Sequence, residues 1–285
     1  MDDLLPGPRL KIARAKALLS ALQQIESQFF NDARCSIIYD TETTPGHKLA
    51  KVKLDTPTPE MMHVLAGEII YHLRSSLDQT AVAFARKSSG PTRPNHIYYP
   101  TGENFKSFVN NCKGFDRKRN KFTGNLRYFD RDLRRAILRT RPYDGGNEPL
   151  RAVFRMANID KHMELIAVAV RGGINSMSYF TTQGAFVGHM INGPGDLREG
   201  VVFSDLMPTG TITPNHPDAR ITVRGKISVG GDGPYAGSEL LPLLAAMVEA
   251  LSKAHDQFTE VLRAREVRKV PENVYFCFRR PYGPS

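Results

Sequence analysis

The hydrophobic pattern of the chain is dominated by long stretches in which apolar residues recur every three or four positions, a period that predicts amphipathic helices. The expected helical part covers about residues 9–30, 58–88, 129–170 and 238–266, with its third long helix at Glu148–Val170. In the first helix the expected apolar stripe comprises Leu10, Ala13, Ala17, Ala21, Ile25 and Phe29. In the second helix it comprises Met62, Leu65, Ile69, Leu73, Leu77 and Phe84.

Two other parts of the chain are rich in β-forming residues and turn signals, and they predict strands over about residues 35–55 and 176–230. The first part predicts a hairpin around Pro45-Gly46, and the second predicts an antiparallel meander. Helices and strands are segregated along the chain, which favours the α+β class, with long amphipathic helices packed with an antiparallel sheet. Because no repeat or linker is visible, we expect a single domain over residues 1–285.

Composition narrows the class of protein. With 285 residues and 41% apolar side chains, the chain is long and apolar enough to form a core without disulfides or a structural metal. Its three cysteines show no CxxC spacing, and the Met1–Pro6 start lacks the basic and apolar regions of a secretory signal. No apolar run approaches the roughly 20 residues of a membrane span. We therefore expect a cytoplasmic protein with no cofactor, no metal and no membrane partner.

The formal charge of +10 is concentrated in one basic segment, residues 113–141, which holds eleven Lys and Arg residues against three Asp residues. Aromatic side chains are interleaved with these cations, a combination suited to phosphate backbones and unpaired bases. The residues expected to contact nucleic acid are Arg117, Lys118, Arg119, Lys121, Arg127, Arg131, Arg134 and Arg135. A solvated segment that keeps the protein soluble is the alternative interpretation.

A polar pair lies on one flank of the second predicted helix. Arg74 and Asp78 are four residues apart, next to Tyr71, so they can form an ion pair or hold a ligand phosphate. Glu68 and His72 share the other flank and could both reach a metal ion. A third ligand cannot be named, so no metal site is predicted.

A polar row on the third long helix is the candidate for catalysis. Arg155, Asn158 and His162 share one face with Ile159. Buried polar groups need hydrogen-bond partners. Either the row pairs internally, with Arg74 and Asp78 as candidate partners, or it faces a cleft and acts on a substrate.

Four short motifs, at His72–Asp78, Tyr99-Pro100, Arg141–Tyr143 and Asn158–His162, give the chain a resemblance to a family of uncharacterised bacterial proteins with NLRSALDH-like and NIDKH stretches. The resemblance covers roughly residues 60 to 165. It implies a shared fold and no particular activity. The sequence departs from the family pattern at His72, Gln79, Arg141 and Met163, where the pattern has asparagine, histidine, glutamine and arginine.

Arg155 and His162, with six residues between them, also resemble the signature of HEPN-type ribonucleases. That resemblance implies metal-independent RNA cleavage, in which His162 acts as general acid or base and Arg155 holds the phosphate. The polar residue usual after the arginine is Met156 here. The leading hypothesis is therefore a protein that binds RNA, DNA or another acidic partner through the basic segment. A HEPN-like ribonuclease and a structural or homodimer-forming protein are the alternatives.

Overall fold

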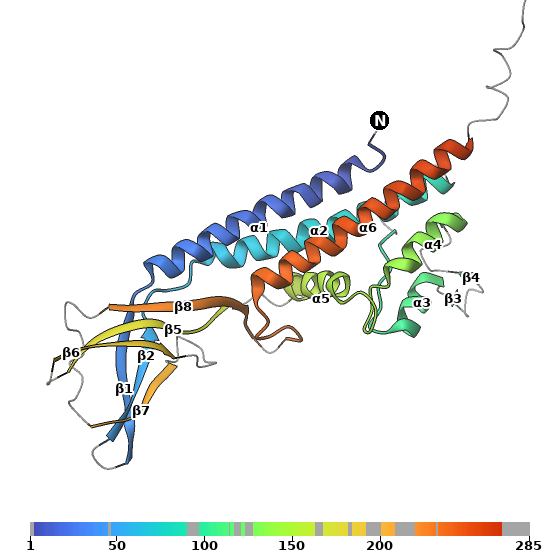
Figure 1. Cartoon of the computed structure of the whole chain (residues 1–285). Coiled ribbons are helices and arrows are strands. Elements are labelled where there is room, and N and C mark those ends of the chain that lie inside the picture. The colour runs from blue at the N-terminus through green and yellow to red at the C-terminus, as the bar shows by residue number, and fades with distance from the viewer. Residues whose placement is uncertain are drawn as a thin grey trace, which may run out of the picture. The chain divides into compact units, whose positions relative to one another are not determined.

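The computed structural model describes the backbone of residues 3–44, 47–89, 97–113, 115–116, 121–122, 128–162, 168–181, 184–191, 201–208, 220–231 and 233–269. Side chains are described over residues 3–36, 53–88, 97–112, 128–159, 225–231 and 233–266. The helices are α1 (Pro6–Asp32), α2 (Glu60–Ser89), α3 (Phe105–Lys113), α4 (Arg131–Thr140), α5 (Glu148–His162) and α6 (Leu240–Lys269) (Figure 1). The strands are β1 (Cys35–Thr44), β2 (His47–Leu54), β3 (Phe115–Asp116), β4 (Lys121–Phe122), β5 (Val168–Thr181), β6 (Gly184–Ile191), β7 (Val201–Pro208) and β8 (Arg220–Val229). The α+β class is confirmed, with helices predominating among the described residues.

The chain divides into two compact units. Unit 1 comprises Met1–Ala15, Tyr71–Arg155 and Ala246–Ser285, and unit 2 comprises Lys16–Ile70 and Met156–Ala245. The division falls inside α1, α2 and α6 and near the middle of α5. The single-domain expectation stays a prediction, because these helices each contribute residues to both units.

An aromatic cluster forms much of the core of unit 1. The ring of Phe84 on α2 meets those of Phe129 and Phe258 edge to face, with centroids 6.2 and 5.2 Å apart. Tyr99 stacks on Phe154 of α5, at 6.0 Å between centroids. Such pairs contribute roughly 0.5–1.5 kcal/mol each beyond their burial. The cluster therefore ties α2, α5 and α6 to the segment around Tyr99.

The apolar stripe predicted for α2 is confirmed, because all six of its members are buried. The stripe predicted for α1 is wrong over most of its length, since Leu10 is 59% exposed and Ala13 and Ala17 are also exposed. The buried face of α1 instead consists of Ile12, Ala15, Leu18, Leu22 and Phe29. Isoleucine and leucine remove more apolar surface from water than alanine does, so they decide which face of the helix turns inward.

The strands of unit 2 form two three-stranded antiparallel sheets, in the orders β1-β2-β7 and β6-β5-β8. The predicted hairpin is confirmed, with Cys35 opposite Leu54 in β1 and β2. The predicted meander is wrong in its order, because β7 pairs with β2 and β8 returns to β5. Local turn signals cannot reveal these pairings, since the partners are separated by long stretches of sequence.

The predicted helix Glu148–Val170 is also wrong at its end. Helix α5 stops at His162, and Val168–Val170 belong to β5, where Val168 lies opposite Val229 of β8. A short apolar run rich in valine fits both the helix period and the two-residue period of a strand. Its β-branched residues favour the strand. Gly172 and Gly173, which follow the predicted helix end, lie within β5, where Gly172 is opposite Gly225.

Helix α1 is joined to β8 within unit 2. The N–H of Ile227 donates to Oε1 of Glu26 at 3.0 Å. A Cβ at Gly225 would collide with the ring of Phe30, so this strand position requires glycine for the close approach. Burial raises the pKa of Glu26, although the bond from Ile227 acts in the opposite direction. The carboxyl group thus links a helix to a sheet edge.

Candidate functional site

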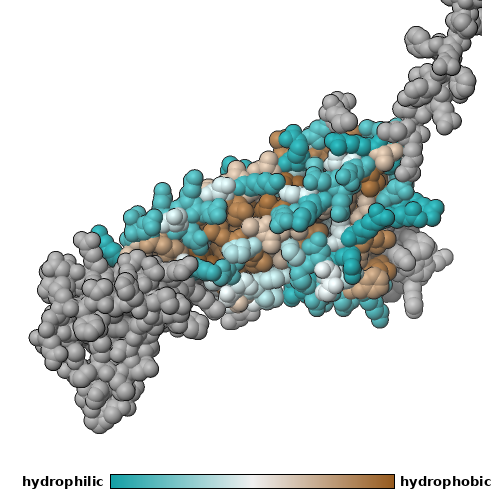
Figure 2. Space-filling view, in the orientation of Figure 1, coloured by the Kyte–Doolittle hydropathy of each residue, from teal (hydrophilic) through white to brown (hydrophobic). Residues whose placement is uncertain are grey.

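Helix α4 separates its residues into a buried face and a cationic face. The buried residues are Leu133, Ala136, Ile137 and Thr140. The opposite side carries Arg131, Arg134, Arg135 and Arg139, all exposed, and we call these four residues the arginine face. They span about 12 Å along the helix axis. In the space-filling view the surface at the position of α4 is hydrophilic (Figure 2).

Asp130 anchors the start of α4. Its Oδ1 accepts the N–H groups of Asp132 and Leu133, both at 3.1 Å, which makes it the N-cap. Its Oδ2 accepts the hydroxyl of Ser88 on α2 at 3.3 Å and pairs with the Arg265 guanidinium of α6 at 2.5 Å. One carboxylate therefore caps the helix and fixes it to two others, which holds the arginine face in a set orientation.

The other end of α4 is anchored in the core of unit 1. The hydroxyls of Thr140 and Tyr99 lie 2.8 Å apart and share a hydrogen bond. Tyr99 is buried, and burial raises its pKa well above the usual value. After Thr140, Arg141 adopts a left-handed backbone with φ of 51°, and its carbonyl accepts the N–H of Asn147 at 2.7 Å. This turn ends α4 and leads into α5.

Part of the predicted nucleic-acid contact set lies outside the described residues, namely Arg117, Lys118, Arg119 and Arg127. Lys121 belongs to β4, which pairs with β3 opposite Asp116. The remaining three, Arg131, Arg134 and Arg135, are brought together on α4. Arg139 joins them, and sequence reasoning did not include it in the contact set although the i, i+4 spacing from Arg135 could have shown it.

The predicted pair of Arg74 and Asp78 forms on α2. Arg74 Nε donates to Asp78 Oδ2 at 3.0 Å, and Asp78 Oδ1 accepts the N–H of Tyr99 at 2.9 Å. The guanidinium of Arg74 also lies over the ring of Phe154, 4.2 Å from its centroid. Its side chain is only 25% exposed. The cation is therefore fixed by one carboxylate and one aromatic face.

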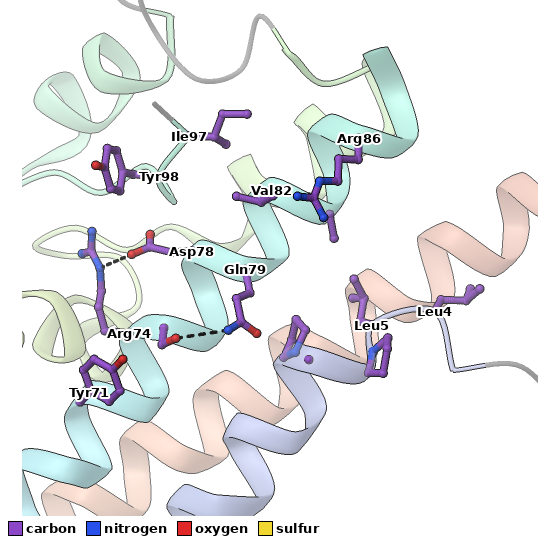
Figure 3. A pocket seen from close by; sticks show the side chains of 15 residues that line it. Leu4, Leu5, Tyr71, Arg74, Asp78, Gln79, Val82, Arg86, Ile97 and Tyr98 are labelled. Atoms are coloured by element: carbon purple, nitrogen blue, oxygen red, sulfur yellow. Dashed lines mark hydrogen bonds and ion pairs between the residues drawn. The ribbon is translucent and has the colours of Figure 1, made fainter. Parts of the chain in front are cut away.

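A cavity of about 620 Å³ lies beside this pair, within unit 1 (Figure 3). Its lining includes Leu4 and Leu5 before α1, Arg74, Asp78 and Val82 of α2, and Ile97. Sequence reasoning predicted the polar pair but missed the cavity. Its walls come from segments far apart in the chain, so no local pattern contains it.

The row proposed for catalysis lies on α5. Arg155 and Asn158 are exposed, and Ile159 is half-buried. His162 ends the helix, and its side chain lies outside the described residues. The contacts of Arg74 with α5 go to Phe154 rather than to Arg155. Arg74 and Asp78 contact each other, Phe154 and Tyr99. Whether the row pairs internally or faces a cleft stays open, because the side chain of His162 is not among the described ones.

No family model, curated protein or solved structure matches this chain. Within the described ranges, no helix is long and apolar enough to cross a membrane. The same residues contain no group of three His, Cys, Asp or Glu side chains that could hold a metal ion. Functional inference therefore rests on the arginine face and on the cavity beside Arg74.

Proposed function

We propose that this protein binds the phosphate backbone of nucleic acid through the arginine face of α4. The observation that carries the proposal is the segregation of this helix, with four exposed arginines on one side, where Leu138 is also exposed, and a buried face on the other. Guanidinium groups suit phosphate because they present forked, permanently charged donors. Four of them within about 12 Å can contact several neighbouring phosphates.

Anchoring of the helix supports binding to an extended ligand. Asp130 and Thr140 hold the two ends of α4, so the arginines are displayed from a fixed backbone. Only their side chains have to be ordered when a ligand binds, which lowers the entropic cost of association. Among the residues that the structure describes, no ion pair joins the arginine face to a carboxylate. The Nε of Arg134 donates to the Phe129 carbonyl, and the positive charge of the face stays available to an external anion.

The test is fluorescence anisotropy of labelled RNA and DNA of about 20 nucleotides, titrated with the full chain between about 50 and 200 mM salt, a range over which phosphate contacts respond steeply. The double variant Arg131→Glu, Arg135→Glu should weaken binding more than about tenfold, and the slope of log affinity against log salt should fall by about two, one for each phosphate that the protein no longer neutralises. The matched control is Lys16→Glu, Lys53→Glu, which changes the net charge equally at exposed positions on α1 and β2.

Two results would contradict the proposal. The first is absence of binding by the unaltered chain at the lowest salt concentration. The second is equal weakening by the control pair, which would mean that net charge, and not the arginine face, attracts the nucleic acid.

A ribonuclease is the second candidate, because Arg155 on α5 is exposed and open to a substrate. In the same titrations, the labelled RNA is run on a gel after incubation without metal ions. Cleavage that is lost in His162→Ala, while binding is retained, would favour a HEPN-like activity. Intact RNA, or cleavage that survives in His162→Ala, would remove this candidate.

A further inference from the structure

The cavity beside Arg74 has the features of a small-molecule site and is separate from the arginine face, none of whose residues lines it. Ligand sites in proteins are typically hollows of roughly 300–1,000 Å³ with apolar walls and a few fixed polar groups. This cavity, of about 620 Å³, falls in that range. Its floor contains Leu5 and Ile97, which are almost fully buried.

We infer that this cavity binds a small aromatic anion, a planar ring system carrying one carboxylate or phosphate group. The inference does not depend on nucleic-acid binding by α4. It rests on a fixed cation at one end of the cavity, on an apolar floor beside it, and on two exposed tyrosines at its mouth.

Arg74 would hold the anionic group. Its hydrogen bond to Asp78 uses only Nε, which donates at 3.0 Å. Among the described residues, no hydrogen bond engages its two terminal Nη groups, so a forked pair of donors remains for a ligand. The ring of Phe154, 4.2 Å away, holds the guanidinium plane in place. A planar cation already oriented in this way can bind a carboxylate or phosphate without first losing side-chain entropy.

Asp78 does not oppose an incoming anion as strongly as a free carboxylate would. One of its oxygens accepts from Arg74 and the other accepts the Tyr99 N–H at 2.9 Å. Arg86 lines the cavity further along α2 and adds a second positive charge (Figure 3). Lys11 lies over the ring of Tyr71, 5.3 Å from its centroid, and adds a third charge nearby. The electrostatic balance of the cavity is therefore positive.

The two tyrosines favour a ligand with an aromatic ring over a purely polar ligand. Tyr71 and Tyr98 both line the cavity and are 61% and 54% exposed, so their rings are accessible at its mouth. They lie at the same end as Arg74 (Figure 3). Val82 and Ile97 continue the surface as an apolar floor. A flat ring can stack against tyrosine at the mouth and rest on this floor while its charged group reaches Arg74.

Isothermal titration calorimetry of the full chain tests the inference. 2-Naphthoate should bind saturably, with a dissociation constant below about 1 mM. Acetate supplies the charge without the ring, and 2-naphthalenemethanol supplies the ring without the charge; each should bind at least about tenfold more weakly, because each lacks either the stacking or the charge-assisted interaction. Adenosine 5′-monophosphate tests an aromatic compound that carries a phosphate in place of the carboxylate. Tighter binding of this compound than of naphthoate assigns the site to phosphate esters, and the reverse assigns it to carboxylates.

Two variants locate the binding. Arg74→Lys keeps the charge beside Asp78 but removes the forked donors, so naphthoate should bind about tenfold more weakly. Ala83→Phe places a ring inside the cavity and should abolish the heat of binding. Arg263→Lys makes the same exchange at an exposed residue of α6 outside this cavity and should leave the affinity unchanged. Thermal melts of each variant show whether the fold is retained.

The inference is overturned if neither naphthoate nor the nucleotide binds saturably up to about 1 mM, or if the neutral alcohol binds as tightly as naphthoate. It is also overturned if a folded Ala83→Phe variant binds with unchanged affinity, because the ligand would then lie elsewhere. Should Arg74→Lys fail to fold, Ala83→Phe alone decides the result.

Discussion

Arginines in two regions of unit 1 have opposite surroundings. Arg74 on α2 is three-quarters buried, bonded to Asp78 and stacked on Phe154. The arginines of α4 are exposed, and within the described part of the chain no ion pair joins them to an acid. Both helices are amphipathic and both carry their cations off the buried face, so the side-chain type alone does not distinguish the two regions.

The difference lies in what each cation meets. On α2 an aspartate follows one helical turn after the arginine, and an aromatic ring of α5 lies beneath it, so the charge becomes part of the packing. On α4, Arg131 has arginines three and four positions further along and Arg135 has one four positions further along, and such like-charged pairs repel by a few tenths of a kcal/mol each; the one acid within the helix, Asp132, lies three positions before Arg135. A paired cation contributes to the fold, whereas an unpaired row is suited to an external anion.

The largest expected effect comes from removing the partner of the enclosed cation. Asp78→Ala leaves Arg74 without its carboxylate and the Tyr99 N–H without an acceptor. We expect the free energy of unfolding, measured by urea denaturation, to fall by about 2–3 kcal/mol. Asp78→Asn, which retains an acceptor for Tyr99, should reduce it by about half as much. A decrease under about 0.5 kcal/mol in Asp78→Ala would mean that the pair is no more than a solvated surface contact.

A smaller effect is expected where a carboxylate supports the arginine face. Asp130→Ala removes the N-cap of α4 and its links to Ser88 and Arg265. We expect the free energy of unfolding to fall by about 1–2 kcal/mol. Asp256→Ala, at an exposed aspartate of α6, is the control and should change stability far less. Nucleic-acid binding should also weaken in Asp130→Ala, because the arginine face is no longer held on a fixed backbone; undiminished binding would show that the orientation of α4 is unimportant.

The smallest expected effect on stability comes from removing one cation of the arginine face. Arg135→Ala removes an exposed cation that no described carboxylate holds. Its free energy of unfolding should change by less than about 0.5 kcal/mol, while its affinity for RNA falls. A clear decrease of stability in urea would indicate a structural role for this arginine and would weaken the proposed function.

Helix periodicity predicts most of the helical part because burial on a helix follows a local rule. The stripe of α2 is an example, since its large apolar residues leave only one face to bury. The same rule fails on the alanine-rich α1, where several faces are apolar and only the positions of Ile12, Leu18 and Leu22 decide between them. It also fails at the start of β5, because Val168–Val170 fits both a helix and a strand until β8 is known to pair with it.

In the candidate sites, too, the sequence predicts contacts within one helix but not contacts between segments that are far apart in the chain. The i, i+4 spacing predicts the bond of Arg74 with Asp78, and the arginine spacing predicts most of the cationic face. Sequence cannot predict that Phe154 lies under Arg74, because that contact joins α2 to α5. Nor can it predict the cavity, whose wall at Leu5 depends on the packing of α1 against α2. There the Ser76 hydroxyl donates to the Pro8 carbonyl at 3.1 Å, and Gly7 leaves room for Gln79.

Tyr99 places a weak acid at the centre of unit 1. Its ring is enclosed by Phe154 and Phe258, and burial raises its pKa above the ordinary value near 10. The phenol stays protonated in the folded chain while the same group in the unfolded chain ionises, so alkali favours the unfolded state increasingly above about pH 10. Strong base therefore weakens the core of unit 1 through the Tyr99 hydroxyl, which shares its hydrogen bond with the last residue of α4.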